Sequence, residues 1–140
     1  MRYLLDTCVI SEAIRRKPEP RVVRWVEARD EGDLYLSVLS LGELQKGIAK
    51  LEDATRRAAL QAWLEGDLLR RFAGRILDVD REVAQRWGAL AASAERRGRP
   101  VPVTDGLLAA TALVHGMAVA TRNVRDLEPT GIPLADPWAG

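Results

Sequence analysis

A short apolar run that ends in an acid opens the chain and limits its fold more than any other feature. Residues 3–5 read Tyr-Leu-Leu, Asp6 follows at once, and Thr7 can cap a helix that begins near Val9. This order predicts a strand, an acid and then a helix. Taken alone, Asp6 is more typical of a helix cap or a turn. At the end of a strand in an open α/β sheet, however, an acid lies in the crevice where such sheets bind ligands.

The same arrangement recurs downstream, beside Glu43, beside Asp105 and beside the pair Asn123 and Asp126. Carboxylates gathered at one sheet edge would repel each other by up to ~4 kcal/mol per close pair at an effective dielectric near 20. A divalent cation relieves that cost. All-oxygen ligands, without a second His or a second Cys in the chain, favour Mg²⁺ or Mn²⁺ over zinc.

The hydrophobic pattern predicts the remaining elements. Further strands are expected at residues 34–37, 76–77, 117–120 and 132–134, and helices at 9–16, 21–29, 54–72 and 81–97. Ser40 can cap another helix, with Glu43 in capping-box position, and Thr104 and Asp105 form a cap pair for a helix that runs to Val114. Apolar strands alternating with helices predict a parallel α/β sheet covered on both faces.

Length and composition are those of one soluble domain spanning residues 1–140. The chain is 47% hydrophobic and 29% charged, has no Pro/Gly/Ser-rich linker, and has no apolar run of membrane-spanning length. The first residues lack the pattern of a signal peptide, and the single Cys8 excludes an internal disulfide, so we expect a cytoplasmic protein. A net charge of +1 means that any binding of nucleic acid must depend on local clusters of basic residues.

Other catalytic chemistries fit the sequence poorly. His115 is the only histidine and falls at a predicted helix end, and no GxSxG motif is present, so a serine triad is not expected. A phosphoaspartyl enzyme built on Asp6 would need a general acid nearby, yet Cys8 stands two residues later.

Four segments carry a family resemblance: LLDTCVISE, SVLSLGEL, VTDGLLAATA and VATRNVRDLE. In this order they resemble the motifs of PIN-domain ribonucleases, and most of all the VapC-type toxins of bacterial toxin–antitoxin pairs. The likeness runs over essentially the whole chain and includes the closing Pro137-Trp138, which is similar to a Pro-Trp motif of one branch. It implies a three-layer α/β/α PIN fold, with a short parallel sheet of about five strands and an acidic pocket at the strand carboxyl ends.

The resemblance also implies the site. Asp6, Glu43 and Asp105 fall on three near-invariant acids of the family, and they are expected to be the catalytic and metal-binding residues. Either Asn123 or Asp126 would take the fourth position.

Polar neighbours of these acids are expected to support them. Thr104 and Thr121 are candidate hydroxyls behind the ligands, and Arg122 could touch a substrate phosphate; each could equally be a helix cap or a strand-end polar residue. Cys8 departs from the family, which usually has Asn or Ser at this place.

The function implied is that of a Mg²⁺-dependent endoribonuclease, with Mn²⁺ as a possible substitute. It would be the toxin of a type II toxin–antitoxin pair and would cleave RNA with a metal-activated water. Its partners would be the RNA substrate and a cognate VapB-like antitoxin, with which it forms a hetero-oligomer. The alternative is a PIN-like binding module that has lost cleavage and acts as a partner subunit.

Two surfaces are predicted for assembly. The resemblance implies a homodimer, for which Trp87, Leu90, Leu107 and Leu108 are candidates, although all four could belong to the core. An antitoxin segment is expected to dock on apolar residues that one small sheet need not bury: Ile10, Ile14, Val22, Trp25, Val26, Leu60, Trp63 and Leu64. The alternative is that Trp25 and Trp63 both belong to the ordinary core.

Overall fold

The computed structural model describes residues 1–139 and contains one five-stranded sheet in which all neighbouring strands are parallel. The spatial order is β3-β2-β1-β4-β5. The strands are β1 (Tyr3–Leu5), β2 (Leu34–Ser37), β3 (Ile76–Leu77), β4 (Ala118–Ala120) and β5 (Leu134–Ala135). The predicted α/β class with about five parallel strands is confirmed.

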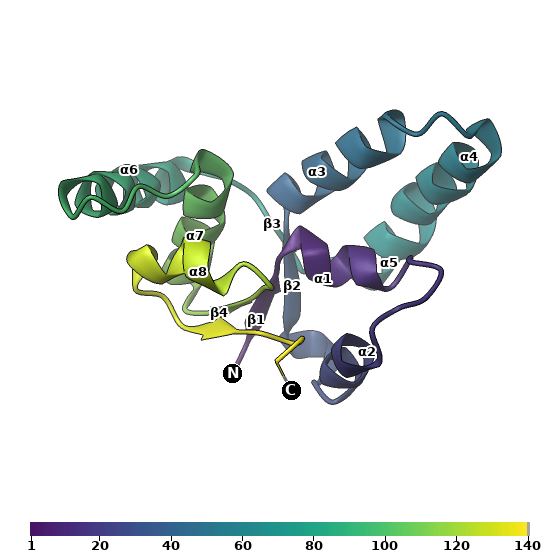
Figure 1. Ribbon diagram of the computed structural model, residues 1–140, viewed down its shortest axis with the longest axis horizontal. Helices are drawn as coiled ribbons and strands as arrows, with labels where there is room; N and C mark the ends of the chain where they lie inside the picture. Colours follow the sequence, from purple (N-terminus) through teal and green to yellow (C-terminus); the bar gives the residue numbers. More distant parts are fainter. Residues whose placement is uncertain (140) are drawn as a thin grey trace.

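Helices cover both faces of the sheet (Figure 1). On one face lie α1 (Thr7–Glu12), α2 (Pro20–Glu27), α3 (Val38–Ala49), α4 (Ala54–Ala62), the π-helical segment η2 (Trp63–Leu68) and α5 (Leu69–Arg71). On the other lie α6 (Arg81–Arg96), α7 (Val103–His115), α8 (Val124–Leu127) and the 3₁₀ turn η3 (Glu128–Thr130). A further 3₁₀ turn, η1 (Glu31–Asp33), leads into β2. No helix within residues 1–139 is both long and apolar enough to cross a membrane.

Alternating side chains of the central strand feed two separate cores. Leu4 packs with α7 and α8, while Leu5, the next residue, packs with α1, α2 and η2. Both side chains are almost fully buried, because β1 lies between two other strands and has helices on both sides. This burial explains why the strand reads as a continuous apolar run rather than an alternating one.

The order of the strands fixes where a ligand can bind. From β1 the chain builds β2 and then β3 on one side, and later returns to add β4 on the other side of β1. The carboxyl ends of β1 and β4 therefore flank the point at which the topology reverses, which is where open α/β sheets bind their ligands. Asp6 follows β1 there, and Thr121 follows β4.

Two helix starts differ from the sequence prediction. Helix α1 begins at Thr7, because the Asp6 carboxylate accepts a hydrogen bond from the Thr7 backbone N–H. Helix α3 begins at Val38, because the Ser37 hydroxyl caps it by accepting from the Leu39 N–H. Ser40, predicted to be the cap, is buried inside the helix, and its hydroxyl has no partner within the described residues. Ser37 and Ser40 can both cap a helix, and Glu43 in capping-box position favours Ser40, but strand β2 decides for Ser37 by ending there.

The long helix predicted for residues 54–72 is interrupted. Helix α4 stops at Ala62, a π-helical segment follows to Leu68, and α5 adds one more turn. Gly66 and Asp67 lie within the wide segment, and both are weak formers of α-helix. Leu64 and Leu68 nevertheless stay buried on the expected face, so the apolar spacing identified the packing but not the change of helix type.

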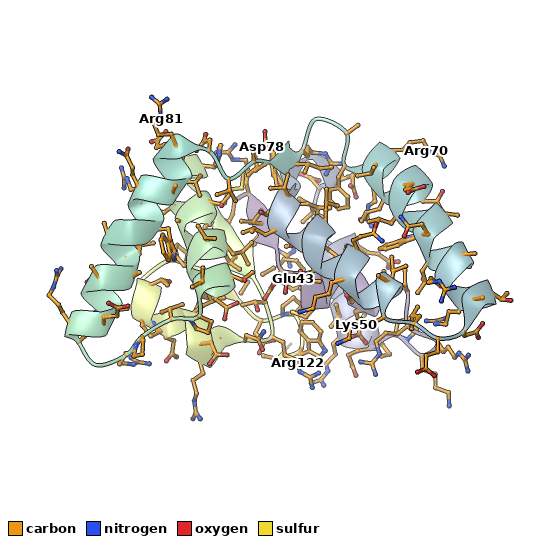
Figure 2. All side chains as sticks on the ribbon, turned by 90° about the horizontal axis from the view of Figure 1, so that it is seen from above. Glu43, Lys50, Arg70, Asp78, Arg81 and Arg122 are labelled. Carbon is orange, nitrogen blue, oxygen red and sulfur yellow. The ribbon has the colours of Figure 1, made fainter. Side chains whose placement is uncertain are left out.

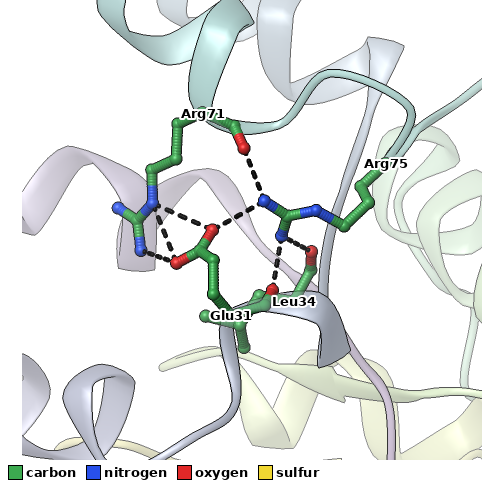
Figure 3. Close-up of polar contacts among 4 residues, drawn as sticks. All are labelled: Glu31, Leu34, Arg71 and Arg75. Carbon is green, nitrogen blue, oxygen red and sulfur yellow. Dashed lines mark hydrogen bonds and ion pairs between the residues drawn. The ribbon is translucent and has the colours of Figure 1, made fainter.

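An arginine clamp holds the start of β2 to the end of α5 (Figure 3). Arg71 and Arg75 both pair with the Glu31 carboxylate, and Arg75 also donates to the backbone carbonyls of Glu31, Leu34 and Arg71. The Arg75 side chain is only 16% exposed, so these carbonyls replace the water that a buried guanidinium would otherwise need. The clamp fixes one edge of the sheet.

Candidate active site

Asp6 lies at the centre of the site and is held by two hydrogen bonds. Its Oδ1 accepts from the Thr7 backbone N–H at 2.7 Å, and its Oδ2 accepts from the Thr121 hydroxyl at 2.7 Å. The side chain is 7% exposed, and Thr121 is fully buried. The ends of β1 and β4 therefore meet through these two side chains, which fix the orientation of the carboxylate.

Glu43 comes to the same edge of the sheet from the first half of α3. Its Oε1 accepts a hydrogen bond from the Thr7 hydroxyl at 2.9 Å. Thr7 thus links Asp6 and Glu43, with its backbone N–H on the first carboxylate and its hydroxyl on the second. From the sequence alone, Thr7 is predicted only to cap a helix. Its position directly after Asp6 is the signal that could have marked it as part of the site.

Asp105 belongs to the first turn of α7, from the opposite side of the site. This helix starts at Val103 after Pro102, and no side chain caps it, so the Asp105 carboxylate is not used as the predicted cap. The next residue, Gly106, permits close packing of α7 on α6: a Cβ there would lie 2.9 Å from the Trp87 ring. This close contact between α6 and α7 fixes the position of the first turn of α7, which carries Asp105.

The electrostatics of Asp105 show which acids are its neighbours. Burial first, and then the negative charges of Asp6, Asp126 and Glu43, raise its pKa to about 6. Asp126 acts on Asp105 from α8, whereas the Asn123 side chain makes no hydrogen bond within the described residues. Of the two candidates for the fourth position, Asp126 is the one that adds charge to this group.

The four carboxylates are neighbours but do not yet converge on one point. The charges of Asp6, Asp126 and Glu43 act on Asp105, yet within residues 1–139 no three acid, His or Cys side chains stand close enough together to hold a cation. The donor set, oxygen atoms from four carboxylates, is that preferred by hard divalent cations such as Mg²⁺ and Mn²⁺.

The remaining predicted residues surround this group at different depths. Thr121 also accepts from the Asn123 backbone N–H, and it lies 3.9 Å from the Cys8 sulfur. Burial is the main reason that the pKa of the Cys8 thiol rises to about 11, which keeps the thiol neutral and unreactive. Arg122 is exposed and stacks over the Trp138 ring at 5.3 Å.

Thr104 is placed differently from Thr121. It is exposed and lines a hollow beside α3, and no hydrogen bond joins it to an acid of the site within residues 1–139. Figure 2 looks down on the molecule from above and shows Glu43 near its middle, on α3.

Comparison with known proteins decides the family. The PIN domain model matches residues 3–128. VapC ribonuclease Y4jK of Sinorhizobium fredii is 38% identical over 96% of this chain and 96% of its own length. The toxin FitB of Neisseria gonorrhoeae is also 38% identical, over 96% of this chain and 97% of its own.

The chain belongs to the PIN-domain family, in its VapC toxin branch.

Solved structures of PIN-domain toxins agree with this fold. The crystal structure of FitAcB from Neisseria gonorrhoeae matches with a TM-score of 0.94 and 38% identity, covering 97% of this chain and 98% of that one. A member of the VapBC family of toxin–antitoxin systems, VapBC-5 from Mycobacterium tuberculosis, matches with a TM-score of 0.63 and 27% identity, covering 87% and 85%.

A hollow lies away from the acids of this PIN domain, between α1, α2, η2 and α5. It has a volume of about 320 Å³, and its walls include Ile10, Val22, Val26 and Trp63 from the predicted docking set. Trp25 is not among its lining residues. It packs edge-on against Tyr3, with ring centroids 4.9 Å apart, and Arg29 covers it. The acids Glu12, Glu27 and Asp67 line the same hollow.

The predicted dimer residues are either buried in the core or half-buried. Leu108 is 3% exposed and belongs to the core between α7 and the sheet. Trp87 packs on Gly106 and so belongs to the contact between α6 and α7. Leu90 and Leu107 are half-buried. The most exposed large apolar side chains of α7 are instead Val103 and Leu113, at 59% and 41%.

Proposed function

We propose that this protein is a divalent-metal-dependent endoribonuclease that acts as the toxin of a type II toxin–antitoxin pair. The observation that carries the proposal is the gathering of Asp6, Glu43, Asp105 and Asp126 at the topological switch point. Burial first, and then the negative charges of the other three acids, raise the pKa of Asp105. Carboxylates brought near one another cost free energy in a purely structural site, whereas a divalent cation relieves that cost. The ribonuclease name of one relative, VapC ribonuclease Y4jK, supports the same proposal.

The side chains of the site would hold the cation and orient the groups around it, and would not themselves react with the RNA. Asp6 and Asp105 would hold the cation, Glu43 would hold it or position the attacking water, and Asp126 would complete the acidic wall. The Thr121 hydroxyl and the Thr7 N–H keep the Asp6 oxygens in place. The chemistry that a bound Mg²⁺ supplies in such a site is activation of water and stabilisation of charge on the phosphate. No side chain of the site needs to act as a nucleophile.

Removal and return of metal test this proposal. Purified protein treated with EDTA should lose cleavage of single-stranded RNA, and added Mg²⁺ or Mn²⁺ should restore it. Zn²⁺ and Ca²⁺ serve as comparison ions, since the all-oxygen site should favour the smaller hard cations for catalysis. Cleavage that continues in EDTA would exclude the proposed chemistry.

The second candidate function is a binding module without cleavage. An acidic site that takes up a cation stabilises the folded state, so millimolar Mg²⁺ should raise the thermal midpoint of the active protein. A module that has lost its site should melt at the same temperature with and without the ion. This melt needs no knowledge of the RNA target.

The partner proposed is an antitoxin that occupies the hollow between α1, α2, η2 and α5. Its apolar walls suit the apolar face of a helical segment, and the exposed Glu27 suits a basic side chain of that segment. The VapBC-type systems among the similar structures support this assignment. We propose further that residues 1–140 form a single PIN domain, that the protein is a homodimer, and that it acts in the cytoplasm, where RNA is available.

A further inference from the structure

A hollow of about 470 Å³ lies directly beside the acids, between the outer face of α3 and the start of α7. Its walls are Leu39, Gly42, Glu43, Lys46, Gly47, Lys50 and Thr104. Glu43 belongs both to this hollow and to the acidic site, and Thr104 is the neighbour of Asp105. The hollow therefore adjoins the acidic site and extends from it along α3.

The charge in this hollow is opposite to that of the site. Lys46 and Lys50 are exposed and lie one and two turns beyond Glu43 on the same face of α3. Neither forms an ion pair within the part of the chain that the structure describes. They are separated by about 6 Å along the helix axis, which is close to the spacing of successive phosphates in an RNA strand. Figure 2 shows Glu43 and Lys50 following one another along α3.

Two glycines inside the same helix have no explanation in the fold. Gly42 and Gly47 flank the line of lysines, and a Cβ added at either would meet no atom of the chain within 4 Å. Glycine is the least favourable residue after proline in a helix interior, and no close contact within the protein requires it here. The space left open at both glycines lets an occupant from outside the chain lie close against α3.

We propose that this hollow is a subsite for the RNA backbone, in which Lys46 and Lys50 contact phosphates next to the scissile one. The inference rests on the proposed ribonuclease function and identifies where the substrate strand leaves the site. RNA approaching four carboxylates is repelled by them, and the chain as a whole, at +1, offers little compensating attraction. Two unpaired ammonium groups beside Glu43 supply that attraction locally, and the missing side chains at Gly42 and Gly47 let the strand approach the helix.

The test measures RNA binding in a protein that cannot cleave. In an Asp6→Asn background, fluorescence anisotropy with an unstructured, labelled RNA oligonucleotide gives Kd as a function of salt. Lys46→Gln with Lys50→Gln should weaken binding at least tenfold at low salt. It should also reduce the slope of log K against log salt by about 1.4, for two lost single-strand phosphate contacts. Lys46→Arg with Lys50→Arg keeps both charges and should restore most of the affinity.

Arg81→Gln with Arg96→Gln is the matched control. Both arginines are exposed on α6, neither forms an ion pair within residues 1–139, and neither lines the hollow, so the pair removes the same net charge elsewhere. Figure 2 shows Arg81 far from Glu43 and Lys50. This control should change Kd less than threefold. If the lysine and arginine pairs lose affinity equally, the effect is one of net charge and the subsite does not exist.

Substitutions at glycines provide an independent test of the RNA subsite. Gly47→Ala should raise the thermal midpoint and yet weaken RNA binding, because the new methyl group enters the hollow. Gly88→Ala, at another open helix position, should raise the midpoint and leave RNA binding unchanged. Equal RNA binding by both variants would contradict the close approach of a strand to α3.

Failure of this inference can be told from failure of the proposed function. Wild-type protein that cleaves RNA, with lysine variants that bind RNA as the arginine control does, would overturn the subsite alone. Lysine-dependent RNA binding by a wild-type protein that never cleaves would overturn the nuclease alone. If the lysine variants instead lose an acidic partner protein and keep RNA, the hollow belongs to that partner and the proposal is wrong.

Discussion

At the scale of single residues, the bond between Thr121 and Asp6 is the most consequential polar contact of the site. Both side chains are buried, and the hydroxyl gives the carboxylate one of its two donors. A hydrogen bond to a buried charge contributes roughly 1.5–3 kcal/mol, about twice a neutral one. Thr121 therefore contributes both to folding and to the orientation of a proposed metal ligand.

Thr121→Val keeps the shape of the side chain and removes this donor. We expect the free energy of unfolding to fall by about 2 kcal/mol in urea titrations, and RNA cleavage to fall as well, because one Asp6 oxygen is left unpaired. Thr121→Ser retains the hydroxyl and should recover most of both. A valine variant with wild-type stability and cleavage would show that the bond has no role.

The charge on Asp105 predicts how stability responds to pH without metal. Its folded pKa of about 6 lies above the ordinary value of 3.8, so the ionised form destabilises the fold above pH 6, and the penalty disappears as pH falls toward 4. Asp105→Asn should therefore melt a few degrees higher than wild type at pH 8, in EDTA. The difference should shrink steadily toward pH 4. A difference independent of pH would contradict the raised pKa.

At the scale of elements, the two tryptophans of the proposed antitoxin surface have different roles. Trp25 on α2 packs against Tyr3 and Arg29, whereas Trp63, at the start of η2, lines the hollow. Their spacing in the sequence made both equal candidates. The two tryptophans differ because α2 is oriented against β1 so that the Trp25 ring packs on Tyr3 of the sheet.

Substitution by alanine should separate the two in the same way. Trp63→Ala should retain cleavage and weaken binding of the cognate antitoxin at least tenfold, about 1.4 kcal/mol. Trp25→Ala should cost about 3 kcal/mol of stability through lost packing. Should Trp63→Ala also lower the thermal midpoint, Glu27→Lys on the exposed rim provides the second variant. Antitoxin binding unaffected by both Trp63→Ala and Glu27→Lys would place the partner elsewhere.

Elements with strong local signals could be predicted from the sequence. Features that depend on contacts between residues far apart in the sequence could not. The apolar run before Asp6 and those of the other strands were enough to predict a parallel sheet, because a parallel strand that is buried on both faces has a nearly continuous apolar sequence. The predicted start of α3 was wrong, because the capping-box position of Glu43 favoured Ser40, whereas strand pairing ends β2 at Ser37 and makes Ser37 the cap. Asp126 and Asn123 were indistinguishable for the same reason: which one reaches Asp105 depends on how α8 packs against α7.

At the scale of the whole molecule, exposed apolar side chains on α7 bear on assembly. Leu113 is 41% exposed on the face of the molecule that carries α6 and α7, and Val103 is exposed on the same helix. Leu108, one of the residues first expected at a dimer interface, is instead core. The proposed homodimer would therefore use the outer surface of α7 rather than the residues that hold it to the sheet.

Light scattering tests this arrangement. Wild-type protein at low micromolar concentration should have the mass of a dimer, and Leu113→Glu should have that of a monomer, because a charge would be buried without a partner at the interface. Leu69→Glu, at a similarly exposed leucine on α5, is the control and should leave the dimer intact. A monomeric wild type would refute the homodimer.

The central claim is that the acids at the topological switch point cleave RNA, and one comparison of cleavage rates tests it most directly. Asp105→Asn is compared with Asp78→Asn, each assayed with Mg²⁺ on the same single-stranded RNA. Asp78 also follows a strand, β3, but it is exposed and is not among the charges that raise the pKa of Asp105. We expect Asp105→Asn to lower the rate by about 10³-fold or more, on the order of 4 kcal/mol in the barrier, and Asp78→Asn to leave it unchanged. Cleavage by Asp105→Asn at the wild-type rate would contradict the account.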